Sequence, residues 1–519
     1  MVNKRVKDAC WLDRRHPQYA DMVAHWQFVM ESYRGGPGWF HKGNLPKYPS
    51  EHPDKYAHRL AGATRDNLTK EVVDQHGGYL FKRKPTRTTT NLKIEAFWGR
   101  AKRHAGDMDD LMAEADTISS LGGRAAIIID KPNIVAVSAA EDKLPYAYTV
   151  GVLDLLDYAH DEDGLLDFVL TMERTRGKVN PMDPKSGCLV NQYRLRDRNG
   201  WSLWEKRDDE AVLIAEGTWN NDGSPFGRVP VVLVDHQDGC EDYAPPGLVD
   251  EIARLDRLIS QEQTSLHEVV EWLGAPTLTF PGSVKDAPDA KPGTAALKLG
   301  VSGLITYPHD AANPPSYLTP DAAFIGVLQD RINSLIEKVR ELASLPSKAS
   351  VAQSGKAKEW DSQPLQARLS TKAANLQAAE DEVNSIVDLF NGGDGKPEKT
   401  SVQYPSTFDV TSLLDDITAA TALDELPGKE SPTYRIQLYK NIVRKSLPDL
   451  DVKTLKKIDE EIEANITAGD SAPQDGPEPQ FDDHGNLIEQ DQEQDQGATG
   501  PVDDQVPPNN KAEGEQEGG

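Results

Sequence analysis

The sequence has little of what secreted and membrane proteins require. Its three cysteines, Cys10, Cys188 and Cys240, lie far apart and form neither a CxxC pair nor a zinc-ligand spacing. We therefore expect a reducing compartment and no disulfide framework. No apolar run approaches the roughly 20 residues that a membrane-spanning helix needs. The basic first residues are not followed by the apolar stretch of a secretory signal. These absences argue against a disulfide-rich, secreted or membrane-bound protein.

Recognisable catalytic motifs are also missing. The sequence has no GxxxxGK[ST] phosphate loop, no GxSxG elbow, no HExxH motif and no EF-hand loop. Asp235-His236 and His267-Glu268 are adjacent polar pairs, but neighbouring side chains point apart, so neither pair forms a site alone. We predict no enzyme, no catalytic residue, no metal ligand and no cofactor. The alternative is a metal-dependent nucleic-acid-processing enzyme whose site is assembled from scattered Asp and His residues.

Charge is distributed unevenly along the 519 residues, whose net charge is −27. Residues 1–105 carry 20 basic and 10 acidic side chains, whereas residues 469–519 carry one basic side chain and 14 acidic ones. The second segment consists largely of Asp, Glu, Gln, Pro and Gly. Such a composition cannot bury enough apolar surface to offset the loss of chain entropy. We predict a disordered acidic tail over residues 469–519.

Periodic patterns elsewhere predict an α+β fold. Helical spacing covers Tyr19–Tyr33, Asp54–Gly77 and, with an interruption near Gly106, Ile94–Leu121. From about residue 122 the chain turns to short runs typical of a mostly antiparallel sheet region. The predicted strands are Arg124–Asp130, Tyr146–Val152, Leu165–Glu173, Cys188–Arg196, Trp201–Lys206, Val212–Gly217 and Val229–Val234.

Two long amphipathic helices follow, each with a single apolar stripe. They cover Leu248–Leu273 and Asp321–Ala343, with Asp321 as a capping residue, and a Pro- and Gly-rich segment separates them. The small, polar residues from Ser344 to Trp360 predict a loop. Further helices are predicted at Gln366–Phe390, Pro432–Lys445 and Val452–Ala464, and a strand at Val402–Val410. Taken alone, the two stripes are also consistent with a plain helical hairpin core.

Several motifs, in this order, resemble tailed-bacteriophage portal proteins over roughly residues 16–400. They are His16-Pro17-Gln18-Tyr19, Tyr33-Arg34-Gly35, Leu45-Pro46-Lys47, Tyr56-Ala57-His58-Arg59-Leu60, the run from Asn67 to Pro85, Gly122-Gly123 through Asp130-Lys131-Pro132, and Pro245-Pro246-Gly247-Leu248 with the helix up to Gly274-Ala275-Pro276. The resemblance implies a portal-like architecture made of a wing, a two-helix stem, a clip and a helical crown.

Carried onto this chain, the resemblance divides it into successive parts. It implies a wing over residues 1–245, stem helices over 246–273 and 320–343, and a clip over 274–319 between them. A tunnel loop over 344–361, a long helix with a return to the wing over 362–428 and a crown over 429–468 follow. The acidic tail over 469–519 has no counterpart that we can quote.

The resemblance also implies function and partners. Portal proteins form a ring, usually of twelve subunits, at one capsid vertex of the virion and are assembled in the host cytoplasm. Their channel passes double-stranded DNA during packaging and ejection. Expected partners are the terminase packaging motor, a head-completion or tail adaptor protein, and the major capsid and scaffold proteins. A capsid or tail structural protein without a channel is a further alternative.

Two groups of candidate site residues follow from this assignment. The expected DNA-facing residues of the tunnel loop are Lys348, Ser350, Gln353, Lys356 and Lys358. The residues expected to pack between subunits in the stem are Ile252, Leu255, Ile259, Leu266, Leu328, Ile332, Leu335 and Val339.

The acidic tail should be dispensable. Because it offers almost no apolar surface to a fold or an interface, truncation after Ala468 should leave folding and oligomerisation unchanged. Circular dichroism and light scattering on the truncated and full-length chains test this. A truncated chain that stays folded and soluble but no longer oligomerises would contradict the prediction.

Overall fold

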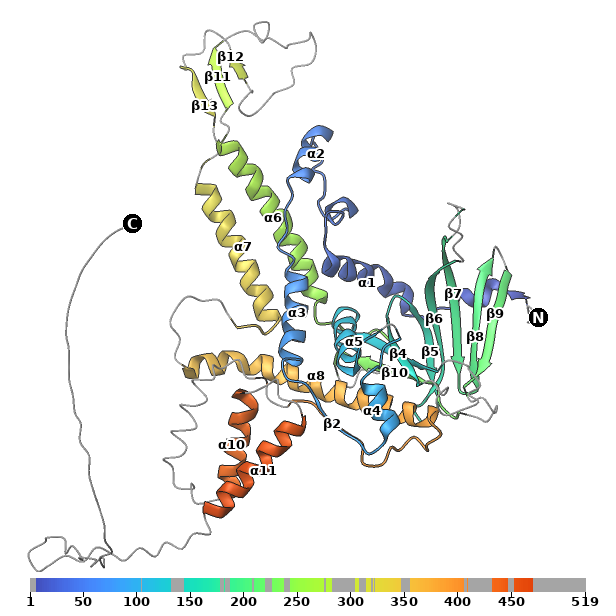
Figure 1. Ribbon diagram of the computed structural model, residues 1–519. Coiled ribbons are helices and arrows are strands. Elements are labelled where there is room, and N and C mark those ends of the chain that lie inside the picture. The colour runs from blue at the N-terminus through green and yellow to red at the C-terminus, as the bar shows by residue number, and fades with distance from the viewer. Residues whose placement is uncertain are drawn as a thin grey trace, which may run out of the picture. The chain divides into compact units, whose positions relative to one another are not determined.

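The structure, a computed structural model, forms two compact units, residues 1–416 and 417–519. It describes residues 6–103, 105–131, 144–177, 182, 187–207, 210–219, 226–237, 243–274, 277–281, 304–307, 314–318, 321, 323–346, 355–405, 408, 432–446 and 452–469. The predicted acidic tail, most of the clip and residues 347–354 of the tunnel loop lie outside this set. The fold class is α+β, as predicted (Figure 1).

The first unit contains two 3-10 turns, η1 (Ala9–Asp13) and η2 (Phe40–Lys42), and eight α-helices among its described residues. The helices are α1 (Tyr19–Arg34), α2 (Pro53–Ala61), α3 (Leu68–Leu80), α4 (Leu92–Trp98), α5 (Met108–Gly122), α6 (Asp250–Gly274), α7 (Ala323–Leu342) and α8 (Gly355–Phe390). Several begin at the expected capping residues. The side chain of Asn67 accepts a hydrogen bond from the backbone N–H of Lys70, and Asp107 and Asp110 form a capping box.

Among the described residues of the first unit, the strands form four sheets. The largest has the order β1-β9-β8-β7-β6-β5 and is antiparallel, from β1 (Val6–Asp8), β5 (Leu155–His160), β6 (Leu166–Arg176), β7 (Leu189–Asp197), β8 (Gly200–Arg207) and β9 (Glu210–Thr218). A second sheet has the order β10-β3-β4 and consists of β3 (Arg124–Asp130), β4 (Tyr146–Gly151) and β10 (Val231–Asp235). A third has the order β12-β11-β13 and consists of β11 (Thr277–Pro281), β12 (Leu304–Tyr307) and β13 (Ser316–Leu318). The fourth pairs β14 (Ser401–Gln403) with β2 (Thr86–Thr88).

Strand β3 lies at the centre of the first unit. Its side chains alternate between two hydrophobic clusters, as the pleat of a strand requires. Ile127 and Ile129 belong to the main core with the helices, whereas Ala126 and Ile128 face the second cluster, which contains Trp26 of α1. Burial on both faces explains why this strand is an unbroken apolar run rather than an alternating one.

Helix α8 carries a row of buried polar residues that includes Lys372, Glu380 and Asn384. Lys372 and Glu380 are eight residues apart, and the later members of the row follow at steps of four. Each is matched by a partner from another element. Lys372 pairs with Asp116 of α5 at 2.6 Å, and Trp98 of α4 donates a hydrogen bond to Asn384 at 2.9 Å. Glu380 accepts hydrogen bonds from Arg87 and from the Tyr404 hydroxyl. Because buried polar groups are stable only when paired, this row fixes the register of α8 against α4, α5 and β2.

The sequence predictions differ from the structure at several boundaries. The predicted helix Asp54–Gly77 is two helices, α2 and α3, because residues 62–67 leave the helical path to place Arg65 against α6. Strand β5 was not predicted, since its sequence Leu-Leu-Asp-Tyr-Ala-His shows no alternation. The predicted helix Leu248–Leu273 begins two residues later than predicted, at Asp250. The short strand β14 covers only the start of the predicted strand Val402–Val410.

The second unit contains a helical hairpin among its described residues. Helix α10 (Pro432–Ser446) packs on α11 (Val452–Gly469), close to the predicted helices. Lys440 of α10 pairs with Glu463 of α11 at 2.5 Å, and Ile466 is buried. These residues coincide with the segment that the resemblance assigns to a crown.

Candidate assembly interface

Helices α6 and α7 lie side by side and form a hairpin (Figure 1). An apolar stripe on each helix faces the other and the main core, which includes Ile252 and Ile259 of α6 and Ile332 and Val339 of α7. An ion pair between Glu262 and Arg331, at 2.7 Å, sets the register along the hairpin. The hairpin is therefore a stable part of the single chain.

The eight predicted subunit-packing residues lie mainly on the inner side of this hairpin. Four of them, Ile252, Ile259, Ile332 and Val339, are buried within the chain's own core. Leu255, Leu266 and Leu335 are partly buried and pack against the same core, and Leu328 is half-buried. The four buried side chains are already covered in one chain, so they offer no surface to a neighbouring subunit. The buried parts of the two stripes therefore form a helical hairpin core within the chain, which is the alternative that the sequence pattern also favoured.

Other apolar side chains on the same hairpin are open to solvent. Val270 of α6 is 49% exposed, and Phe324 and Val327 of α7 are 52% and 63% exposed. The register set by Glu262 and Arg331 brings the end of α6 opposite the start of α7, so these three residues share one end of the hairpin. Exposed apolar side chains at one end of a hairpin take part in a protein–protein contact when they adjoin one another. The periodic pattern alone places Val270 and Phe324 on the apolar stripes of the two helices and does not single out Val327, so it does not distinguish the exposed positions from the buried ones.

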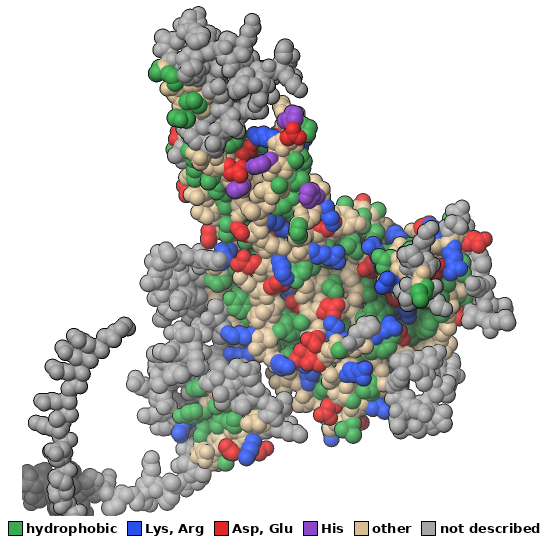
Figure 2. All heavy atoms as spheres, turned by 45° about the horizontal axis from the view of Figure 1, so that its top comes forward, with side chains coloured by type: hydrophobic (Ala, Val, Ile, Leu, Met, Phe, Trp, Pro, Cys, Tyr) green, Lys and Arg blue, Asp and Glu red, His purple; other side chains and the backbone are tan. Residues whose placement is uncertain are grey.

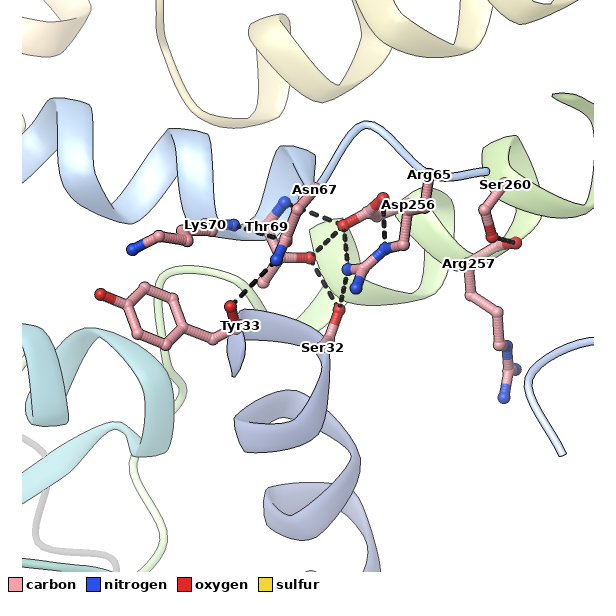
Figure 3. Close-up of polar contacts among 9 residues, drawn as sticks. All are labelled: Ser32, Tyr33, Arg65, Asn67, Thr69, Lys70, Asp256, Arg257 and Ser260. Carbon is pink, nitrogen blue, oxygen red and sulfur yellow. Dashed lines mark hydrogen bonds and ion pairs between the residues drawn. The ribbon is translucent and has the colours of Figure 1, made fainter. Parts of the chain in front are cut away.

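A buried carboxylate anchors α6 to the N-terminal helices (Figure 3). Asp256 is 1% exposed and accepts two hydrogen bonds from Arg65, at 3.2 and 2.5 Å. It also accepts hydrogen bonds from the backbone N–H and the hydroxyl of Thr69, at 2.9 and 2.6 Å. Arg65 donates further to the Ser32 hydroxyl at 2.7 Å. One carboxylate thus joins α6 to α1, to the start of α3 and to the segment before α3.

The C-terminal end of α7 is held by donors from two other helices. His76 of α3 donates its Nε2–H to the carbonyl of Ala343, at 2.9 Å, and Arg368 of α8 donates to the carbonyl of Leu342, also at 2.9 Å. Burial lowers the pKa of His76 to about 4, so the ring is neutral at physiological pH. Ser344 then takes a left-handed conformation with φ of 55°. These contacts cap the carbonyls that the last turn of a helix leaves unpaired.

Helix α8 begins at Gly355, inside the segment predicted as the tunnel loop. Lys348, Ser350 and Gln353 lie outside the described residues, whereas Lys356 and Lys358 belong to the first turns of α8. The helix begins at Gly355 because Lys, Ala and Glu at 356–359 all favour helix. Pro364 lies inside α8. The orientation of these lysines toward DNA stays a prediction.

The clip prediction is only partly within the described residues. Strand β11 pairs in parallel with β12 and antiparallel with β13, between α6 and α7 along the chain. The side-chain hydroxyl of Thr279 donates a hydrogen bond to the carbonyl of Ser316 at 2.8 Å and links β11 to β13. The described residues of the insert between the two long helices thus form a small sheet.

The described part of the chain contains no group of three or more His, Cys, Asp or Glu side chains arranged to hold a metal ion. No helix within the described ranges is long and apolar enough to cross a membrane. A hollow of about 560 Å³ lies beside Trp11 and Phe168, but its arginines Arg14 and Arg198 already pair with carboxylates. We assign no chemistry to that hollow.

Comparisons with known proteins give only distant likenesses. No protein-family model matches the sequence, and no curated protein matches it. Among solved structures, a chain of the virion of a native gene transfer agent particle is similar with a TM-score of 0.38 and 8% identity, over 79% of this chain and 98% of that one. Chains of the neck of empty and native gene transfer agent particles also have TM-scores of 0.38, with 7% identity. They cover 76% and 82% of this chain and 95% and 94% of theirs. These values are too low to establish a shared fold or function.

Removal of the Asp256 carboxylate should destabilise the first unit strongly. Asp256→Ala leaves the buried Arg65 guanidinium unpaired, and breaking a buried pair in this way costs about 3–5 kcal/mol. As a control, Lys70→Ala removes an exposed pair with Asp74 and should change stability by less than about 1 kcal/mol. Urea unfolding of both variants measures the difference. Equal unfolding midpoints for the two variants would show that the anchor is not structurally important.

Proposed function

We propose that this protein is a portal-type subunit that assembles into a ring at one vertex of a phage-like capsid. In this proposal the ring encloses the channel for packaging and release of double-stranded DNA. The observation that carries the proposal is the α6–insert–α7 hairpin, which is stable within one chain and still exposes Val270, Phe324 and Val327 at one end. A stable hairpin with a row of uncovered apolar side chains fits a repeated contact with a second copy.

Further features of the chain support the same function. The order of a wing-like sheet and helix unit, a helical hairpin with a small sheet inserted, and a long return helix agrees with the portal-like sequence motifs. The net charge of −27 also suits a conduit for DNA, since a channel lined with many cations would hold the phosphates too tightly. The packaging motor, the tail adaptor and the capsid and scaffold proteins remain proposed partners.

The size of the purified protein distinguishes the portal proposal from the enzyme alternative. Light scattering and negative-stain electron microscopy should show a closed ring, because a closed ring satisfies identical contacts on every subunit. The resemblance to portal proteins implies about twelve copies. A particle that remains a monomer or dimer at all concentrations would overturn the proposal. A large assembly without a central hole would favour a structural protein without a channel.

Ring contacts should depend on the exposed residues of the hairpin rather than on its buried stripe. Phe324→Ser with Val327→Ser should leave the subunit folded, because both side chains are already exposed, but should weaken assembly. Burial of an apolar side chain of this size contributes roughly 1.5–3 kcal/mol at each contact. The assembled fraction in sedimentation velocity should fall accordingly.

Two further variants control for this experiment. Leu92→Ser removes a side chain that is 78% exposed at the start of α4, and it should leave assembly unchanged. Ile259→Asp places a charge in the chain's own core, so it should unfold the hairpin as well as abolish rings. Rings of normal stability in the Phe324/Val327 double variant would exclude this surface as the subunit contact.

The lysines around the start of α8 should affect DNA transit without affecting assembly. In the proposed ring, Lys348, Lys356 and Lys358 meet phosphates through contacts that salt weakens. The triple Lys→Ala variant should form normal rings but show altered packaging or DNA retention in a packaging assay. Normal packaging by this variant over a range of salt concentrations would place the lysines on an ordinary outer surface.

A further inference from the structure

The helical hairpin of the second unit is small for a fold that stands on its own. Its helices α10 and α11 have 15 and 18 residues. A fold of fewer than about 40 residues usually needs disulfides, a metal ion or association with another chain. Residues 432–469 contain no cysteine, and the described part of the chain has no group of side chains arranged to hold a metal ion. Contacts beyond the hairpin are the remaining source of stability.

The apolar stripes of the hairpin are only half covered. The half-buried apolar side chains are Ile436, Ile442 and Val443 of α10 and Leu455, Ile458 and Ile462 of α11. Among the large apolar residues of this unit that the structure describes, only Ile466 is buried, and Tyr439 is 43% exposed. Figure 2 shows hydrophobic side chains at the surface of this hairpin, at the lower left. Two helices that pack on each other therefore leave part of each stripe open.

One ion pair shows which flank of each helix is closed. Lys440 of α10 is 9% exposed and pairs with Glu463 of α11, so these two side chains lie where the helices meet. Successive residues of a helix are about 100° apart, which places Tyr439 about 100° around α10 from Lys440. On α11, Ile458 and Glu461 lie about 140° and 160° from Glu463. Because both flanks are turned away from the junction, they lie on opposite sides of the hairpin.

The two helices also differ in charge. Residues 432–446 contain four basic side chains and no acidic one, whereas residues 459–463 contain four acidic side chains. Of these, Glu460 and Glu461 are exposed. Complementary charges of this kind favour a contact between different flanks over a contact between like flanks. The acidic part of α11 therefore fits the basic α10 of a second copy of this chain.

We propose that the α10–α11 hairpins of neighbouring copies pack side by side, with the Tyr439 flank of α10 in one copy against the Ile458–Glu461 flank of α11 in the next. The inference rests on the proposed function, because a ring holds successive hairpins close together and so strengthens a weak contact. A contact between two different flanks can repeat around a closed ring. The second unit thus supplies an assembly surface of its own.

Disulfide trapping in the full chain tests this contact. In a chain whose three natural cysteines are replaced by serine, Tyr439→Cys with Glu461→Cys should give covalent dimers and longer products on oxidation. The matched control replaces Glu461→Cys by Glu460→Cys. Glu460 is also exposed but lies about 100° further around α11, so this pair should give several-fold less product. Tyr439→Cys alone should give almost none.

The other outcomes of this experiment overturn the inference. Normal rings without linked products would exclude the contact and leave the proposed function intact, whereas the absence of rings from the unchanged chain would overturn both. A product of monomer size would show that the two flanks meet within one chain. Dimers formed as readily by Tyr439→Cys alone would show a symmetric contact between two α10 helices.

A second variant measures the contribution of the contact to assembly. Tyr439→Ser removes an exposed side chain, so the helical content in circular dichroism should not change. Sedimentation velocity should show that the rings dissociate at a several-fold higher protein concentration than those of the unchanged chain. Glu460→Ser is the control and should leave this concentration unchanged. Equal dissociation of the Tyr439→Ser and Glu460→Ser rings would overturn the proposal.

Discussion

The arrangement of the hairpin relative to the body of the first unit depends on one buried ion pair, between Asp256 and Arg65. A carboxylate in an apolar interior is tolerated only when its lone pairs are occupied, and here Thr69 completes the set. The donors come from α3 and from the segment before it, and Arg65 is in turn bonded to Ser32 of α1. The Asp256 carboxylate can accept all of these hydrogen bonds in only one position of α6. The pair therefore specifies geometry more than it adds net stability.

Polar contacts of two kinds surround this anchor, and their burial separates their roles. Along α8, buried residues such as Lys372 and Glu380 are paired with partners on other elements, so any shift of the helix would leave charges unpaired. Along the outer half of α6, the contacts are only partly buried, as in the pair of Lys55 with Glu268, whose side chains are 46% and 19% exposed. The first kind therefore specifies position more strongly than the second.

This division bears on how an assembly could be built from the chain. The hairpin buries its own stripes, so a subunit does not need a neighbour in order to fold. The surface left for contact with a second subunit is the exposed end of the hairpin, which carries Phe324 and Val327. In the proposed ring, a contact surface of this sort would allow folding and assembly to be separate steps.

The sequence by itself determined the elements that follow from local rules. The apolar run of β3, the two stripes of α6 and α7, the Asp321 cap and the insert between the helices were all predicted from spacing and turn residues. Tertiary structure alone decided the rest. A stripe shows that one face of a helix is covered but not what covers it, so the burial of Ile259 and Val339 within one chain was not predicted. Nor could spacing join Asp256 to Arg65, which are 191 residues apart, since their pairing depends on the low polarity of a core that exists only after the chain has folded.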